Sequence, residues 1–154
     1  MSAVLQKTYD TIIGEVTIEA TAQAVTALYI GKPKEGIAQG ESDVMQQAIR
    51  ELTAYLAGEL QTFTTPLAPQ GTEFQQRVWQ ALQTIPYGET KNYKQVAELI
   101  GNANASRAVG NANNKNPILI MIPCHRVIGA TGKLVGYGAG LPLKEHLLNL
   151  EKKL

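Results

Sequence analysis

Hydrophobic and polar residues alternate along the first thirty positions, with the period of two that is typical of strands. Val16, Ile18 and Ala20 share one face of such a strand. Leu28 and Ile30 share one face of another. Turn-forming residues separate these runs, so the pattern predicts two or three antiparallel strands at the start of the chain.

The period changes to that of a helix between positions 42 and 60. Apolar residues recur there at spacings of three and four, and Ser42 stands where an N-cap is expected. A connector rich in proline and glycine follows, with the sequence TFTTPLAPQG. We place a domain boundary in it, which gives an N-terminal α/β lobe over residues 1–70 and a second domain over residues 71–154.

Apolar stripes in the second domain predict helices over residues 73–85, 93–100 and 105–113. The last two are short and are joined by a tight Gly-Asn turn. They carry small alanines where they would cross, and Ala108 is expected to be buried there. This pattern is typical of a helix-turn-helix, although many helical hairpins share it. One more helix is expected at the end of the chain, with a stripe of Leu143, Leu147, Leu150 and Leu154.

Composition narrows the class of protein. The chain has 154 residues, of which 44% are hydrophobic and 18% are charged, so it is expected to fold and not to be disordered. No apolar run approaches the length of a membrane span, and no secretory signal is visible, so we expect a cytoplasmic protein without a membrane partner. The single cysteine excludes an internal disulfide and a multi-thiolate zinc site.

Charge divides the chain at the same connector. Residues 1–70 carry four basic and eight acidic residues, whereas residues 71–154 carry ten basic and five acidic residues. Between residues 90 and 144 the only acidic residue is Glu98. Such a basic stretch is suited to binding a polyanion. From charge alone, an ordinary solvated basic surface is an equally good interpretation.

The single cysteine, Cys124, has neighbours that favour a reactive thiol over a buried structural one. Pro123 stiffens the entry to it, and the positive potential of His125 and Arg126 is expected to lower the thiol pKa. Because neighbouring residues of a strand point to opposite faces, His125 reaches the thiol directly only where the chain turns. A bridging water would relax this requirement.

A histidine that activates a thiol needs an acid to orient its other ring nitrogen. Glu151 is the best candidate, because it lies four residues after Leu147 at the edge of the apolar stripe of the last helix. Glu145 and Glu98 remain alternatives.

A set of motifs surrounds the cysteine. The central motif is the pentapeptide Pro123-Cys124-His125-Arg126-Val127. Before it come Arg107-Ala108-Val109-Gly110 and Asn116-Pro117, and after it come Tyr137 and Lys144. In these motifs the chain resembles the O6-alkylguanine-DNA alkyltransferases, or methylated-DNA–protein-cysteine methyltransferases. The resemblance spans residues 71–154. It implies an α+β protein: a small ribonuclease-H-like strand and helix lobe, then a mostly helical C-terminal domain with a winged-helix-like helix-turn-helix motif that binds DNA.

The resemblance implies direct-reversal DNA repair. The alkyl group of O6-alkylguanine in duplex DNA, with O4-alkylthymine as a further candidate substrate, would move irreversibly to Cys124 in a single, suicidal turnover. A thiolate displaces such a group without a metal or cofactor, so none is expected. The protein would bind the minor groove as a monomer and flip the damaged base out of the duplex. Cooperative packing along DNA is left open.

The family's residue roles transfer position by position. Cys124 would accept the alkyl group, His125 and a water would pass its proton to Glu151, and Asn116 would brace the segment before the cysteine. Tyr93 and Lys144 complete the catalytic set. The residues expected at the substrate are Arg107, as a finger inserted into the duplex, with Tyr137, Gly138, Met121 and Val135. The residues expected at the DNA are Arg107, Tyr93, Lys91, Lys94, Lys115 and Arg126.

The chain departs from the family pattern in the pocket loop, where Ala139 is expected to narrow the space for bulky adducts. The zinc cluster of some relatives is also missing. An alkyltransferase-like protein, which binds lesions without efficient transfer, is the main alternative, and the presence of Cys124 argues against it. A thiol hydrolase and a plain helix-turn-helix regulator fit less well, because no oxyanion-hole motif and no dimerisation helix is visible.

Overall fold

The structure is a computed structural model that describes residues 3–130, 132, 137 and 139–152. These residues fall into two compact units. The first contains the residues up to Gln70 together with Pro117–Met121, and the second contains Gly71–Asn116 and the residues from Ile122 onward. Strands and helices are both present, so the predicted α+β class is confirmed.

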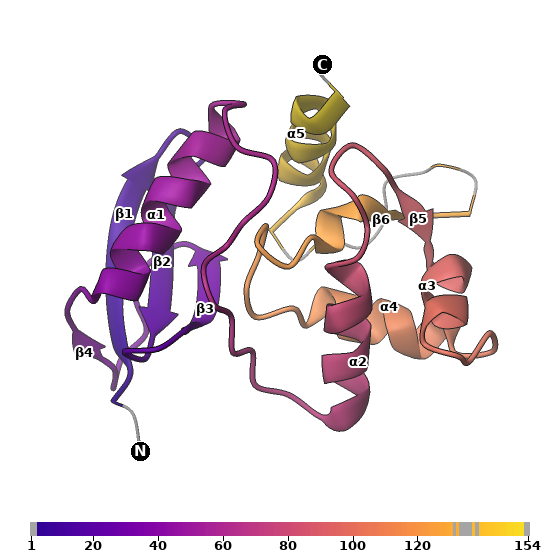
Figure 1. Ribbon diagram of the computed structural model, residues 1–154, viewed down its shortest axis with the longest axis horizontal. Coiled ribbons are helices and arrows are strands. Elements are labelled where there is room, and N and C mark those ends of the chain that lie inside the picture. Colours follow the sequence, from indigo (N-terminus) through magenta and orange to yellow (C-terminus); the bar gives the residue numbers. More distant parts are fainter. Residues whose placement is uncertain (1–2, 131, 133–136, 138, 153–154) are drawn as a thin grey trace. The chain divides into compact units, whose positions relative to one another are not determined.

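Among the described residues, the first unit forms a four-stranded sheet in the order β3-β2-β1-β4 (Figure 1). Its strands are β1 (Leu5–Thr11), β2 (Gly14–Ala20), β3 (Val25–Ile30) and β4 (Ala38–Gln39). The first three strands pair antiparallel, which confirms the antiparallel strands predicted at the start of the chain. The short β4 pairs parallel to β1 and was not predicted, because two residues carry no readable period.

Helix α1 (Asp43–Leu56) covers this sheet through contacts with β2 and β3 (Figure 1). Its start is fixed as predicted, because the Ser42 side chain accepts a hydrogen bond from the Met45 amide at 3.3 Å. Ile18 and Leu28 from the sheet and Leu52 from the helix are fully buried. These side chains form the core of the unit.

A later segment of the chain returns to the edge of β3. The Leu28 amide donates to the Pro117 carbonyl at 2.9 Å, and the Leu119 amide donates to the Leu28 carbonyl at 3.0 Å. The next residue, Ile120, has a φ of 71°, which is costly for a β-branched side chain. The start of the apolar run before the cysteine is therefore held at the edge of the sheet, and Ile120 within the run is strained.

The second unit contains three helices that pack on one another: α2 (Glu73–Leu82), α3 (Tyr93–Leu99) and α4 (Ser106–Asn114). The buried Trp79 ring joins two of them, because its Nε1 donates to the Ala112 carbonyl at 2.9 Å. A Cβ atom on Gly71 would lie 2.5 Å from this ring, so only glycine lets the chain pass there.

The predicted helix-turn-helix is present as α3 and α4. The turn between them uses Gly101 with a φ of 81°. The prediction that Ala108 is buried was wrong, because the inward positions of α4 are Val109, Ala112 and Asn113. Ala108 precedes Val109 by one residue, about 100° around the helix, and faces solvent.

The rest of the second unit surrounds the cysteine segment. A one-turn 3₁₀ helix, η1 (Cys124–Arg126), leads directly into β6 (Val127–Ile128). Strand β6 pairs parallel with β5 (Lys91–Asn92), which lies immediately before α3. The unit closes with α5 (Leu141–Lys152).

Helix α5 does not bury the leucine stripe that the sequence predicts. Its buried residues are Lys144, Leu147, Leu148 and Glu151. Leu143 and Leu150 are only half buried, and Leu154 lies outside the described residues. The inward face thus carries two charged side chains, which a count of apolar residues cannot detect.

Within the part of the chain that the structure describes, no helix has the length and hydropathy needed to cross a membrane.

Candidate active site

The cysteine lies at the start of the one-turn helix η1. Its amide donates to the Ile122 carbonyl at 2.8 Å, and its carbonyl accepts from the Val127 amide at the end of the turn. Pro123 itself lies in a bent conformation, with φ at −81° and ψ at 62°. The Cys124 side chain is nearly closed off, with 2% of its surface exposed. The chain therefore turns at the cysteine, as a direct approach of His125 requires.

Two asparagines brace this turn. Asn116 Nδ2 donates to the Ile122 carbonyl at 2.8 Å, which fixes the segment before the cysteine. Asn113, on the inner face of α4, donates from Nδ2 to the Cys124 carbonyl at 3.5 Å. Asn116 is among the residues predicted from the sequence, whereas Asn113 is not, because it reads as an ordinary polar residue in an asparagine-rich stretch.

His125 and Glu151 meet in the interior. His125 Nε2 lies 2.7 Å from Glu151 Oε2, and neither side chain is more than 1% exposed. Because an ionised carboxylate only accepts, Nε2 carries the proton in this hydrogen bond. The competing acids Glu98 and Glu145 are both exposed. Of these three candidates, the structure brings Glu151 to the histidine.

Arg126 differs from the expectation that it contacts DNA. Its guanidinium is buried, with 7% of the residue exposed, and donates from Nε to Glu151 Oε1 at 2.9 Å and from Nη2 to Glu151 Oε2 at 3.0 Å. Nη1 donates to the Ile85 carbonyl at 2.7 Å. The prediction that Arg126 contacts DNA was wrong, because these internal acceptors occupy its guanidinium.

The thiol is harder to ionise than the sequence suggests. Burial raises the pKa of Cys124 to about 11, whereas a hydrogen bond from Asn116 and the charge of Lys144 act in the opposite direction. The expectation that His125 and Arg126 lower this pKa was wrong, because burial outweighs the nearby positive charge. The buried thiol is therefore protonated at neutral pH.

Lys144 is the second buried cation. Its Nζ donates to the Val127 carbonyl at 2.5 Å, and the residue is fully buried on the inner face of α5. Burial lowers the pKa of Lys144, and the nearby Cys124 raises it. Its ammonium group is thus placed where a thiolate would attract it.

Two tyrosines lie close enough to the cysteine to be influenced by its charge. Burial, and then the Cys124 charge, raise the pKa of both Tyr93 and Tyr137. Tyr93 is half buried at the first position of α3, and Tyr137 is buried with an unsatisfied hydroxyl among the described residues. Both phenols stay protonated near neutral pH and can donate hydrogen bonds.

The other basic residues expected to contact DNA differ in how far their side chains are exposed. Arg107 is exposed at the second position of α4. Lys94 on α3 and Lys115 at the end of α4 are also exposed, and Lys91 on β5 is half buried. These basic groups come from β5, α3 and α4, which are close neighbours within the second unit.

For the remaining expected pocket residues, the prediction is not tested by the described structure. Met121 is buried in the first unit. Val135 and Gly138 lie outside the described residues. Among the described residues, no group of three or more histidine, cysteine or acidic side chains is arranged to hold a metal ion.

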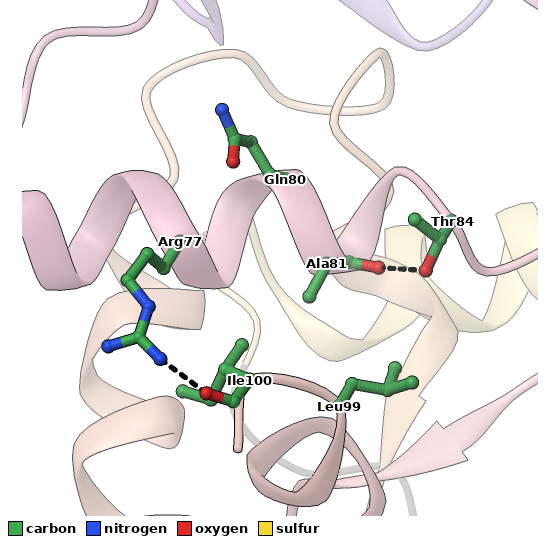
Figure 2. Close-up of a pocket in the computed structure, with 6 residues that line it drawn as sticks. All are labelled: Arg77, Gln80, Ala81, Thr84, Leu99 and Ile100. Carbon is green, nitrogen blue, oxygen red and sulfur yellow. Dashed lines mark hydrogen bonds between the residues drawn. The ribbon is translucent and has the colours of Figure 1, made fainter. Parts of the chain in front are cut away.

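A separate surface hollow of about 380 Å³ lies on the second unit (Figure 2). It is lined by α2 and the end of α3, where the Arg77 guanidinium donates to the Ile100 carbonyl. Its other lining residues are Gln80, Ala81, Thr84 and Leu99. None of the six is an expected site residue, so this hollow adds nothing to the cysteine site.

Comparison with known proteins follows the two units. Residues 73–153 match the DNA binding domain of 6-O-methylguanine DNA methyltransferase, and residues 4–69 match its ribonuclease-like domain. A methylated-DNA–protein-cysteine methyltransferase of Methanosarcina acetivorans is 49% identical over 148 residues, which covers 93% of this chain and 95% of the relative. The protein of the same name from Mycobacterium tuberculosis is 47% identical over 150 residues and covers 95% and 91%.

Solved structures agree with these relatives. The crystal structure of the Mycobacterium tuberculosis O6-methylguanine methyltransferase has a TM-score of 0.88 and 47% identity, with 97% of this chain and 93% of that chain covered. The structure of Mycobacterium tuberculosis OGT in complex with DNA has a TM-score of 0.89 at the same identity, with 96% and 92% covered.

Proposed function

The chain belongs to the 6-O-methylguanine DNA methyltransferase family, and we propose that it repairs DNA by moving the alkyl group of O6-alkylguanine onto Cys124. One observation carries this assignment to the cysteine. The thiol lies in a tight turn next to a buried histidine that is hydrogen-bonded to a buried carboxylate. A cysteine with only a structural role needs neither neighbour.

The transfer is a displacement at carbon. The Cys124 sulfur forms a bond to the alkyl carbon, and the bond from that carbon to guanine O6 breaks. The electrons of the broken bond stay on the base, which takes up a proton and becomes ordinary guanine. The thioether left on the protein does not hydrolyse under mild conditions, so each molecule acts once.

The thiol proton has to leave for the sulfur to attack, because the pKa of Cys124 is about 11. We assign its acceptance to neutral His125, directly or through a water, with Glu151 stabilising the resulting imidazolium. Asn116 and Lys144 then favour the thiolate, one by a hydrogen bond and the other by its charge. The alkylated sulfur is neutral and no longer interacts with that charge.

The duplex is assigned to the surface of α3 and α4. We propose that the protein approaches the minor groove as a monomer and turns the damaged nucleotide out of the stack, which costs a few kcal/mol. The exposed Arg107 would fill the space that is left, and Lys94 and Lys115 would contact phosphates. Tyr93 and Tyr137 would donate hydrogen bonds to the extruded base, because both hydroxyls stay protonated.

The test is the mass of the intact protein after mixing with a duplex that contains one O6-methylguanine. We expect a stoichiometric gain of one methylene unit, located on Cys124 by peptide mapping. Cys124→Ala should show no gain and still bind the duplex. Binding of the lesion without any gain by the unmodified chain would instead indicate a lesion-binding protein and overturn the proposal.

A further inference from the structure

Arg126 is the buried charged side chain of this site that the proposed reaction leaves without a role. Its guanidinium donates twice to the Glu151 carboxylate and once to the Ile85 carbonyl. It also lies over the Tyr87 ring, with Cζ 5.8 Å from the ring centroid. A bidentate pair of this kind fixes both the position and the ionisation of the carboxylate.

The same carboxylate has two side-chain partners, His125 and Arg126. Glu151 Oε2 lies 2.7 Å from His125 Nε2 and 3.0 Å from Arg126 Nη2. Glu151 Oε1 accepts from Arg126 Nε at 2.9 Å and from the Gly88 amide at 3.3 Å. The arginine charge therefore already balances the carboxylate before any proton reaches the histidine.

We propose that Arg126 is a positioning residue that keeps His125 neutral, and so able to take the Cys124 proton, by neutralising Glu151 and fixing its Oε2 on Nε2. This inference rests on the proposed function, since it concerns the proton that leaves the thiol. Without the arginine, Glu151 would attract a proton to His125 before the substrate arrives. The base would then be occupied.

The other charged and titratable groups around His125 do not replace this role. Burial is the strongest influence and lowers the pKa of His125, the hydrogen bond and charge of Glu151 raise it, and the charges of Arg126 and Lys144 lower it. Lys144 donates from its Nζ to the Val127 carbonyl. Arg126 is thus the cation that shares an oxygen with the histidine.

The phenols and the thiol near the site are neutral at the pH of interest. Burial raises the pKa of Tyr87, Tyr137 and Tyr93 above its usual value, and that of Cys124 to about 11. Changes in their charge therefore do not explain a response near neutral pH. The titration that matters there is that of His125 against Glu151, Arg126 and Lys144.

The first test is the pH dependence of the transfer rate under single-turnover conditions with saturating damaged duplex. In Arg126→Gln, we expect the decline of the rate at low pH to move upward by about one pH unit, the effect of a close charge. The rate lost at neutral pH should return at higher pH. Arg126→Lys keeps the charge and should retain the profile of the unmodified chain.

A purely structural role predicts another result. Arg126→Gln would then slow transfer by the same factor at every pH, and the midpoint of the profile would not move. That outcome overturns the inference.

The second test does not depend on the single variant folding. Arg126→Gln combined with Glu151→Gln removes both charges and leaves neither one buried alone. The His125 pKa, measured by NMR without DNA and assigned with the help of His146→Gln, should not rise above that of the unmodified chain, because the carboxylate that the arginine offsets is removed as well. A clear rise would mean that Arg126 acts on the histidine independently of Glu151, which overturns the inference.

The unmodified chain is assayed in parallel so that the two proposals fail separately. If it takes up no alkyl group, the proposed function fails, and the NMR titration still tests the arginine. The unmodified chain takes up the alkyl group in the other case. If the midpoint of the pH profile in Arg126→Gln and the His125 pKa in the double variant then do not respond as expected, only the proposed role of Arg126 fails.

Discussion

Glu151 reaches His125 from the last turns of α5, across 26 positions of sequence, and places Oε2 2.7 Å from the imidazole Nε2. Both side chains are buried, so the pair is shielded from solvent. A hydrogen bond of this length between buried groups sets the orientation of the ring. Helix α5 thus supplies the hydrogen-bond partner of the histidine in the η1 turn.

Replacing this carboxylate should reduce both stability and transfer. Glu151→Gln keeps the shape but leaves Arg126 as a buried charge without a counter-charge, which costs about 3–5 kcal/mol. We also expect transfer to slow by about tenfold or more, because the imidazolium loses its partner. Urea unfolding and single-turnover rates measure the two effects. The matched control is Glu145→Gln on the exposed side of the same helix, and equal behaviour of the two variants would contradict the assignment.

Transfer by the unmodified chain should depend on pH through His125. Burial lowers the pKa of His125 from its usual value of 6.5, so the neutral base is present at neutral pH and is lost only in more acidic solution. The rate should be level around neutral pH and fall below the His125 pKa. In His125→Gln, the rate should instead rise about tenfold per pH unit toward the Cys124 pKa of about 11. A level profile in this variant would exclude His125 as the base.

Arg107 should matter for lesion engagement. Arg107→Ala removes an exposed side chain from the start of α4, so the fold should be unaffected while repair slows by about tenfold or more. The comparison is Arg50→Ala, which removes an exposed arginine from α1 in the other unit. Repair at the unmodified rate in Arg107→Ala would show that the finger assignment is wrong.

Lys94 should act through charge alone. In Lys94→Ala, binding to damaged and undamaged duplexes should weaken by a similar factor, and the slope of log affinity against log salt should decrease in magnitude by about one. Titrations at several salt concentrations measure this slope. An effect confined to the damaged duplex would instead indicate contact with the base.

Gly71 should be needed for the packing of the second unit. A Cβ atom there would lie 2.5 Å from the Trp79 ring, which is buried and hydrogen-bonded to Ala112, so Gly71→Ala should destabilise by about 1–3 kcal/mol. Gly110→Ala is the control, because a Cβ atom in that helix would meet Tyr93 at 3.7 Å, an ordinary contact. It should stabilise by about 0.5–1 kcal/mol. Equal urea unfolding of both variants would contradict this account.

The sequence predicts those elements whose residues repeat with a clear period. The alternation of β2 and the stripe and cap of α1 are visible in the chain, and both elements appear in the structure. The helix α3 and the helix α4 follow for the same reason. Periodicity does not predict which residues of α5 are buried, because its inner face carries the charged residues Lys144 and Glu151 near the cysteine turn.

The site itself is predictable only in part. The expected proximity of His125 and Glu151 is present, and it follows from a motif and one helix position. The place of Arg126 does not follow, because a basic residue reads as a surface charge until its partners are known. Asn113 and the Ile85 carbonyl act through contacts between distant segments, which leave no local pattern in the sequence.

Trp79 is the single tryptophan of the chain, and its indole is wedged between α2 and α4. Its fluorescence is therefore an intrinsic spectroscopic label for the half of the molecule that carries the cysteine. With excitation selective for indole, the first unit contributes no fluorescence because it has no tryptophan. Far-ultraviolet circular dichroism, in contrast, records the secondary structure of both units. Transitions recorded by the two signals can thus be compared to ask whether the halves melt together.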